Sequence, residues 1–231
     1  KNTEDPRTKF IIATYKNPAD PLADTAPNVV TAEQFGVPIG ILNTELSKAA
    51  YRGVRGGGYN YSQMNVNSLA SLTAPAFWVT YGEVSLLLAE AAQRGWIAGG
   101  AAAAKQYYED GIRADIARYS LYPKTSAIPE GDIVAFLASP NVAYNATNGI
   151  ELINNQLWIV YLTNGVQAFA NFRRSGFPAL SPNKANDLYG GGFARRLSYP
   201  DYELAQNNAN YLAAAAAIGG DKMTSRVFWD K

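Results

Sequence analysis

Apolar residues recur with the period of an α-helix in two neighbouring stretches near the middle of the chain. The first stretch, residues 79–96, is covered mostly by leucine, valine and alanine when it is wound as a helix. Four polar residues fall on one narrow stripe: Thr80, Glu83, Glu90 and Arg94. Because so little of its surface is polar, we expect this helix to be enclosed by neighbouring helices.

The second stretch, residues 101–119, predicts an ordinary amphipathic helix. Its apolar face consists of Ala101, Ala104, Tyr108, Ile112, Ile116 and Tyr119. Its polar face consists of Gln106, Glu109, Asp110 and Arg113. Gly111 lies inside this helix, where glycine costs roughly 1 kcal/mol relative to alanine. We therefore expect another backbone to come close at Gly111.

The two helices form a hairpin, because Gly95, Gly99 and Gly100 supply a turn between them. Such a hairpin has about the length of a tetratricopeptide unit, roughly 34 residues. The sequence shows one unit of this kind, whereas a free-standing solenoid needs about three or more. The pair is therefore expected to pack against helices elsewhere in this chain or in a portion that this sequence lacks.

The remaining sequence divides into a loop-rich segment and a helical body. Residues 1–76 are rich in Pro, Gly and Asn, which predicts long loops with one or two short helices or strands. Residues 77–231 form the helical body, with further helices predicted over 133–137, 149–163, 166–174 and 201–218. The helix over 149–163 has one apolar side, made of Leu152, Ile153, Leu157, Val160 and Tyr161. The predicted fold is mainly α, with a tetratricopeptide-like hairpin packed against further helices and long irregular loops.

Composition excludes several classes of function. The 231 residues are 48% hydrophobic and 17% charged, which is typical of a globular protein. With 20 Lys and Arg against 19 Asp and Glu, the chain has no general positive field, so nucleic acid is not an expected partner. The absence of Cys and His removes thiol nucleophiles, Ser-His-acid triads and thiolate or imidazole metal sites. We expect no cofactor and no metal site; the Asp and Asn clusters lack EF-hand spacing and leave calcium undecided.

A series of short motifs follows the order and spacing of a known family across nearly the whole chain. The most specific is the run from Thr80 to Ala91 (TYGEVSLLLAEA) with Arg94-Gly95-Trp96. The others are Asp5-Pro6-Arg7, Gly36 with Pro38 and Gly40, Tyr107-Tyr108, Gly111-Ile112, Ile153 to Trp158 (INNQLW), Phe172 to Pro178 (FRRSGFP), Arg196 to Pro200 (RLSYP), Glu203 with Asn207, and Trp229-Asp230. In this series the chain resembles the C-terminal half of the SusD/RagB family.

The resemblance implies a nutrient-binding lipoprotein on the cell surface, at the outer face of a Gram-negative outer membrane. Such proteins cover a TonB-dependent, SusC-like transporter and capture oligosaccharides or, in some members, peptides; they are not enzymes. Residues 1–231 would then be the C-terminal portion, since the family's N-terminal half and its lipidated Cys are not in this sequence. Contact with the membrane would occur only through that lipid anchor. A helical interaction scaffold without its own ligand site is the alternative from a different class of function.

One glycine-rich loop combines aromatic and arginine side chains. Sugar binding needs flat aromatic faces for the C–H faces of the rings and planar polar groups for the hydroxyls. The candidate ligand-binding residues are Tyr51, Arg52, Arg55, Tyr59 and Tyr61. The same pattern also fits a solvent loop whose tyrosines tuck into the body of the protein. Residues 189–193 (YGGGF) are a weaker candidate of the same kind.

Two further groups of residues have structural interpretations. Glu83 and Glu90 lie seven residues apart on one helix, which fits an inverting glycosidase only loosely. Arg94 at i+4 favours an ion pair with Glu90 instead, and we expect no catalytic residue. Arg173 and Arg174 are expected to satisfy helix-terminal carbonyls and a buried carboxylate, for which Glu90 is the proposed candidate. The four tryptophans are expected to be core residues: Trp78, Trp96, Trp158 and Trp229.

Overall fold

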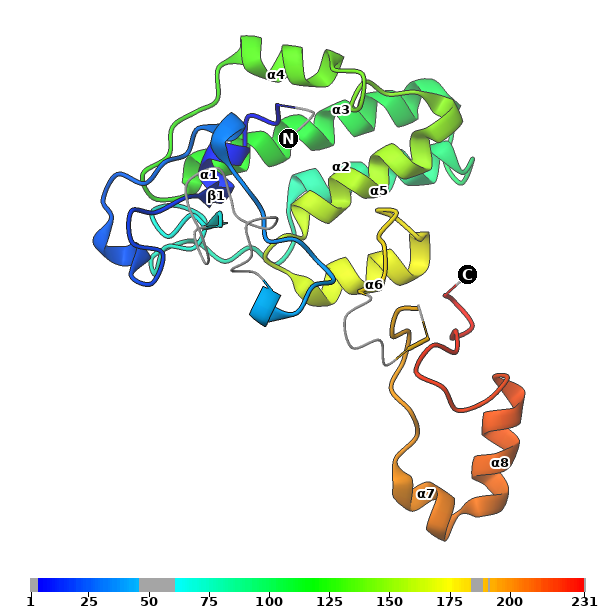
Figure 1. Ribbon diagram of the computed structural model, residues 1–231. Helices are drawn as coiled ribbons and strands as arrows, with labels where there is room; N and C mark the ends of the chain where they lie inside the picture. The colour runs from blue at the N-terminus through cyan, green and yellow to red at the C-terminus, as the bar shows by residue number, and fades with distance from the viewer. Residues whose placement is uncertain (1–3, 46–60, 184–188, 191, 231) are drawn as a thin grey trace. The chain divides into compact units, whose positions relative to one another are not determined.

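Helices make up most of the regular structure in this computed structural model (Figure 1). The structure describes residues 4–45, 61–183, 189–190 and 192–230. It divides into two compact units, residues 1–160 and residues 161–231. The mainly α fold predicted from the sequence is confirmed.

The first unit is built around the predicted hairpin, which consists of α2 (Tyr81–Gln93) and α3 (Gly100–Arg118). α5 (Gly149–Val160) packs against both helices, and α4 (Glu130–Ala138) lies beside α3 (Figure 1). Short 3₁₀ turns follow α3 at Tyr119–Leu121 and precede α5 at Ala146–Asn148. The hairpin is therefore held by helices from later in the same unit.

Local sequence accounts for the ends of the two hairpin helices. The Thr80 hydroxyl accepts a hydrogen bond from the Glu83 amide at 3.1 Å and so caps the start of α2. In the turn, Gly95 and Gly99 have φ angles of +73° and +101°, which side-chain-bearing residues rarely adopt. The predicted glycine turn is thus confirmed.

The apolar faces predicted for α3 and α5 form the centre of the core. On α3 the buried residues include Ala104, Tyr108, Ile112 and Ile116, and Tyr119 is buried in the turn that follows. Ala101, at the start of α3, is exposed and is the one member of the predicted face that the core does not take up. All five residues predicted for the apolar side of the helix over 149–163 are buried: Leu152, Ile153, Leu157, Val160 and Tyr161.

The expectation that α2 is enclosed on all sides is wrong. α3 and α5 cover one side of this helix, where Leu86 and Ala89 have no exposed surface. On the other side Val84, Leu87 and Leu88 are 41%, 42% and 37% exposed. The high apolar content of α2 therefore produces an open apolar surface as well as a core face.

A fully buried arginine ties the N-terminal segment to this core. The Arg7 guanidinium contacts Asp5 at 2.6 Å, Asp115 of α3 at 2.7 Å and Gln156 of α5 at 2.9 Å. Burial by itself lowers the pKa of Arg7, but the two carboxylates together hold that pKa above its ordinary value. Arg7 therefore stays charged and joins three segments that are far apart in the sequence.

The N-terminal segment has little regular structure, as its Pro, Gly and Asn content predicts. It contains α1 (Thr8–Ile11) and the 3₁₀ turns Pro21–Ala23, Thr31–Glu33 and Asn43–Glu45. Strand β1 (Ile12–Ala13) pairs antiparallel with β2 (Gln63–Met64), so that Ile12 faces Met64. This two-residue ladder joins the two ends of the segment.

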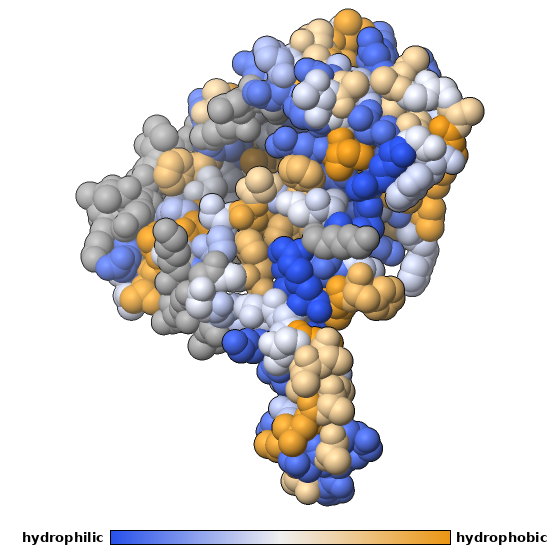
Figure 2. Space-filling view, turned by 90° about the vertical axis from the view of Figure 1, so that its right-hand side faces the viewer, coloured by the Kyte–Doolittle hydropathy of each residue, from blue (hydrophilic) through white to orange (hydrophobic). Residues whose placement is uncertain are grey.

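The second unit contains α6 (Gly165–Ser175), α7 (Asp201–Gln206) and α8 (Asn208–Ala217). The single last helix predicted from the sequence is divided at Asn207, whose φ and ψ angles are −135° and 41°. The Asn207 side chain donates to Glu203 at 3.0 Å and accepts from Asn210 at 2.7 Å. Asparagine favours such local bonds over helix interiors, which explains the break. Apolar residues of the α7–α8 pair are open to solvent (Figure 2), among them Leu204 and Leu212.

Candidate functional site

Most of the predicted ligand-binding loop lies outside the described residues. This applies to Tyr51, Arg52, Arg55 and Tyr59. Tyr61 is described: its side chain is only 3% exposed, and its ring stacks on Phe35 with the centroids 5.6 Å apart. In this structure Tyr61 is packed into the body of the protein. The loop as a ligand site stays a prediction.

The weaker candidate, residues 189–193, is described in part. Phe193 lies edge-on to Phe172 of α6, with the ring centroids 5.0 Å apart. Gly190 has a φ of +61°, a left-handed conformation that glycine adopts without strain. The aromatic ring at this position therefore packs within its own unit.

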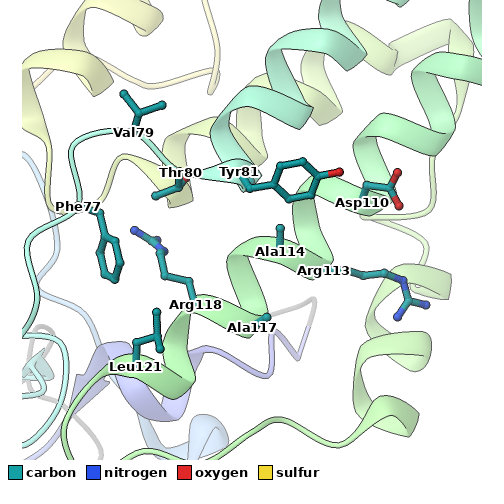
Figure 3. Close-up of a pocket in the computed structure, with 11 residues that line it drawn as sticks. Phe77, Val79, Thr80, Tyr81, Asp110, Arg113, Ala114, Ala117, Arg118 and Leu121 are labelled. Atoms are coloured by element: carbon teal, nitrogen blue, oxygen red, sulfur yellow. The ribbon is translucent and has the colours of Figure 1, made fainter.

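An apolar groove runs along the hairpin between the start of α2 and the C-terminal half of α3 (Figure 3). Its volume is about 780 Å³. Eleven residues line it: Phe77, Val79, Thr80, Tyr81, Gly82, Asp110, Arg113, Ala114, Ala117, Arg118 and Leu121. The volume is within the range of roughly 300–1,000 Å³ that is usual for small-molecule sites.

The local sequence explains why this groove is open and aromatic. Residues 77–79 are an irregular lead into the Thr80 cap, so their side chains lie outside the helical packing of α2. Ala114 and Ala117 are small and leave space on α3 (Figure 3). Around that space Val79, Tyr81 and Leu121 are 70%, 71% and 64% exposed. Such a cluster of exposed apolar residues marks a contact surface.

Charged residues stand along the same groove, and each arginine has a carboxylate partner. Arg113 contacts Glu130 at 2.6 Å, and Arg118 contacts Asp115 at 2.6 Å. Asp110 accepts a hydrogen bond from Gln106 at 2.9 Å. The groove therefore offers hydrogen-bonding groups without a large net charge.

Arg118 lies at one end of the groove and is largely buried. Its side chain is 9% exposed. The guanidinium carbon lies 5.4 Å from the centroid of the Phe77 ring (Figure 3). Within the described part of the chain its Nε has no hydrogen-bond partner. A buried N–H donor without an acceptor destabilises the fold, so this end of the groove has a polar group whose hydrogen bonding is incomplete.

Two tryptophans beside the hairpin contradict the expectation that they are core residues. Trp78 is 92% exposed and Trp96 is 70% exposed, because both stand in the irregular segments that flank α2. Trp96 has one contact of note, with Arg94, whose guanidinium lies 5.4 Å from the ring. Trp158 is only half-buried, and Trp229, at 36% exposed, is not a core residue either. Periodicity cannot place an aromatic residue that lies outside a helix.

The two glutamates of α2 have structural positions. Glu90 is 2% exposed, pairs with Arg94 at 2.8 Å and accepts from Asn154 at 3.3 Å, so the predicted ion pair is confirmed. Glu83 follows the Thr80 cap in the first turn of its helix, where a carboxylate is favourable. The predicted pairing of Arg173 or Arg174 with Glu90 would join the two units and stays a prediction. Within its own unit Arg173 donates to the Arg195 carbonyl.

A second, more polar hollow of about 830 Å³ lies between the N-terminal segment and α4. Its lining includes four charged residues: Glu4, Asp5, Lys9 and Asp132. Phe136 contributes apolar surface to the same lining. In the described residues no group of three or more acidic side chains is arranged to hold a metal ion. Among the helices of the described ranges, none has both the length and the apolar character needed to cross a bilayer.

A family model named SusD-like, described as starch-binding and associating with the outer membrane, matches residues 1–200. No curated protein sequence gives a match. A solved chitin-binding protein is 33% identical with a TM-score of 0.72; the match covers 99% of this chain and 47% of that protein.

Two further solved structures are similar over the same extent. A SusD-like protein from Bacteroidetes is 27% identical with a TM-score of 0.71, over 99% of this chain and 51% of its own. A candidate nutrient-binding outer-membrane protein of Bacteroides vulgatus is 25% identical with a TM-score of 0.69, over 100% of this chain and 49% of its own. The chain thus spans about half the length of these structures.

Proposed function

This chain belongs to the SusD-like family of starch-binding proteins that associate with the outer membrane, and we propose that it captures nutrient oligosaccharides at the bacterial cell surface. The observation that carries this proposal is the family match over residues 1–200. A similar solved structure is a chitin-binding protein, which supports a carbohydrate as the ligand.

The primary ligand site in this proposal is the glycine-rich loop. Tyr51, Arg52, Arg55 and Tyr59 supply aromatic faces and planar donors close together in the sequence. Tyr61 supports the end of the loop, because its ring is fixed against Phe35. The loop would bind sugar hydroxyls through the arginines and ring faces through the tyrosines.

Capture without catalysis is the second part of the proposal. The one buried carboxylate of α2, Glu90, is neutralised by Arg94 and lies in the helix core rather than in the groove. A glycosidase needs two carboxylates on opposite sides of one accessible bond. In this proposal the protein releases its ligand unchanged.

Delivery to a TonB-dependent, SusC-like transporter is the third part. The family description of association with the outer membrane supports a location at that membrane. Attachment through a lipid anchor is part of the proposal. A ligand captured at the cell surface needs a channel to enter the cell. Peptide capture for the same type of transporter, or a scaffold that only contacts the transporter, are the alternatives.

Isothermal titration of the full chain against maltohexaose, chitohexaose, cellohexaose and a tryptic peptide mixture tests the proposal. We expect heat of binding with at least one glycan and no new reducing ends after prolonged incubation. The double variant Arg55→Ala, Tyr59→Ala is expected to lose the part of that heat that comes from the loop, whereas Tyr202→Ala, an exposed tyrosine of α7, retains all of it. Binding of peptides alone would favour the peptide alternative. If no probe gives heat of binding, the result would support a scaffold that only contacts the transporter and would overturn ligand capture.

A further inference from the structure

The groove between α2 and α3 is formed by residues 77–82 and 110–121, which do not include the glycine-rich loop, and nothing in the proposed function uses it. We propose that this groove is a second glycan-binding site, which takes a short stretch of a neutral oligosaccharide. The inference rests on the proposed function, because it assigns a further site to the same class of ligand. Three features of the groove support it.

The first feature is the placement of aromatic rings around small residues. The Tyr81 ring lies above Ala114, and its hydroxyl is directed toward Asp110 (Figure 3). Phe77 stands at the opposite end of the groove, beyond Ala117 (Figure 3). A sugar ring seated over the alanines would place its C–H surface against the Tyr81 ring, the contact that aromatic faces make with sugars.

The second feature is the balance of charge. Arg113 and Arg118 are already paired with Glu130 and Asp115, each at 2.6 Å. An acidic or phosphorylated ligand would have to compete with these carboxylates for the guanidinium groups. A neutral ligand does not, and its hydroxyls can donate to Asp110 while the ion pairs remain intact.

The third feature is the polar character of the two ends, which disfavours a purely apolar occupant. An apolar helix laid in the groove would remove Asp110 and Arg113 from water without replacing their hydrogen bonds, which is costly. At the other end, the Nε of Arg118 has no hydrogen-bond partner among the described residues. Displacement of the Phe77 ring would expose this donor to a ligand hydroxyl, which is a suitable acceptor.

Two opposite changes in the full chain test the site. Tyr81→Ala removes the exposed ring, and Ala117→Trp fills the groove from an exposed position of α3, so neither disturbs the core. Trp96→Ala is the matched control, since it removes an exposed aromatic ring at the other end of the same hairpin. Affinity is measured by isothermal titration with the glycan among maltohexaose, chitohexaose and cellohexaose that binds the unmodified chain.

We expect Tyr81→Ala and Ala117→Trp each to raise the Kd of the groove site, fitted separately from that of the loop, about tenfold, which corresponds to about 1.4 kcal/mol, whereas Trp96→Ala leaves it unchanged. Unchanged glycan affinity in both groove variants overturns the second site but leaves the loop proposal standing. If those variants instead lose co-purification with the transporter while glycan affinity is retained, the groove is a protein interface and the inference is wrong. If the unmodified chain gives no heat of binding with any of the three glycans, the proposed function and this inference are both wrong.

Discussion

Gly82 of α2 and Gly111 of α3 face each other where the two hairpin helices come closest. A Cβ on Gly82 would lie 3.0 Å from the Gly111 carbonyl oxygen, and a Cβ on Gly111 would lie 3.1 Å from the Gly82 carbonyl oxygen. The close approach predicted from a glycine inside a helix is confirmed. The register of α2 on α3 depends on this contact, and so does the position of Tyr81, which follows the Thr80 cap directly and precedes Gly82.

Replacement of Gly111 by alanine is expected to destabilise the protein. The new Cβ would lie 2.7 Å from Leu86 Cγ, a buried side chain, so the helices must move apart or Leu86 must change rotamer. Overpacking of this kind costs about 1–3 kcal/mol, against a gain of about 1 kcal/mol in helix propensity. Urea unfolding of Gly111→Ala should therefore show a lower midpoint than the unmodified chain.

Gly131→Ala is the control for this experiment, because a Cβ on that glycine of α4 meets nothing within 4 Å. This variant gains only the higher helix propensity of alanine, so its urea midpoint should be equal to or higher than that of the unmodified chain. A Gly111→Ala protein as stable as Gly131→Ala would show that the hairpin adjusts without cost.

Replacement of Arg7 by leucine is expected to be among the most damaging single changes. Arg7 has no exposed surface, and its removal leaves Asp115, 1% exposed, without one of its cationic partners. Breaking a buried pair in this way costs about 3–5 kcal/mol. Lys105→Ala removes an exposed partner 3.8 Å from Glu109 and should change stability by less than about 1 kcal/mol. Comparable urea midpoints for both variants would contradict the structural role of Arg7.

The helices could be predicted from the sequence because their apolar residues repeat with the correct period. Tyr108 and Ile112 mark the buried face of α3, and Leu157 marks that of α5. The division at Asn207 was missed, since the alanine-rich sequence after it favours a continuous helix and the local bonds of one asparagine decide otherwise.

The groove could not be predicted, because its two walls come from residues 77–82 and 110–121. These walls meet only through the register that Gly82 and Gly111 set, and a sequence pattern does not specify register. The exposure of Trp78 could not be predicted for a related reason: outside a helix, no period shows whether an aromatic residue faces inward. In the same way, the tyrosine and glycine pattern of the loop does not show that Tyr61 is buried.

Replacement of Tyr61 should affect stability before it affects binding. Its ring is 3% exposed and stacked on Phe35, so Tyr61→Ala leaves a cavity and is expected to cost about 3–5 kcal/mol. Tyr61→Phe keeps the ring and its stacking on Phe35, so it should be much less damaging to stability than Tyr61→Ala and should retain glycan affinity. Loss of affinity in Tyr61→Phe, with an unchanged midpoint, would instead show that the hydroxyl contacts the ligand.

Buried tyrosines predict a loss of stability at alkaline pH. Burial raises the pKa of Tyr108, whose hydroxyl donates to the Val142 carbonyl at 2.8 Å. Above about pH 10 the unfolded chain releases this proton while the native state keeps it, so the free energy of unfolding falls as pH rises. The stabilisation from the Tyr108 proton is fully present below the pKa of tyrosine in the unfolded chain, and it is lost as pH rises toward the higher pKa of Tyr108 in the native state.

Urea unfolding between pH 9 and pH 11.5 measures this effect. Tyr108→Phe removes the titrating group, so its stability should fall less steeply with pH, by up to about 1.4 kcal/mol per pH unit. The variant is also expected to be about 1–2 kcal/mol less stable at pH 8, because the Val142 carbonyl loses its donor. Equal slopes for the two proteins would show that the Tyr108 phenol does not resist ionisation.

Asp221 fixes the α7–α8 pair within the second unit. Its carboxylate contacts Arg196 at 2.5 Å, accepts from the Tyr199 amide at 3.1 Å and from the Tyr211 hydroxyl at 3.3 Å. Partial burial would raise the pKa of Asp221, but the Arg196 guanidinium and the Tyr199 amide hold it below its ordinary value. Asp221→Asn removes the charge, so we expect amide exchange over residues 197–218 to become faster. Asp201→Asn, an exposed residue of α7, is the control.

The direction of this pKa shift also predicts a pH dependence. Because the pKa of Asp221 is lower in the native state than in the unfolded chain, its stabilisation is present above the unfolded pKa near 4 and is lost as pH falls through the native value. Protection of residues 197–218, corrected for intrinsic exchange, should therefore be greater at pH 7 than at pH 3 in the unmodified chain. In Asp221→Asn that difference should shrink, since the titrating group is gone. An undiminished difference would assign the acid sensitivity of the pair to another carboxylate.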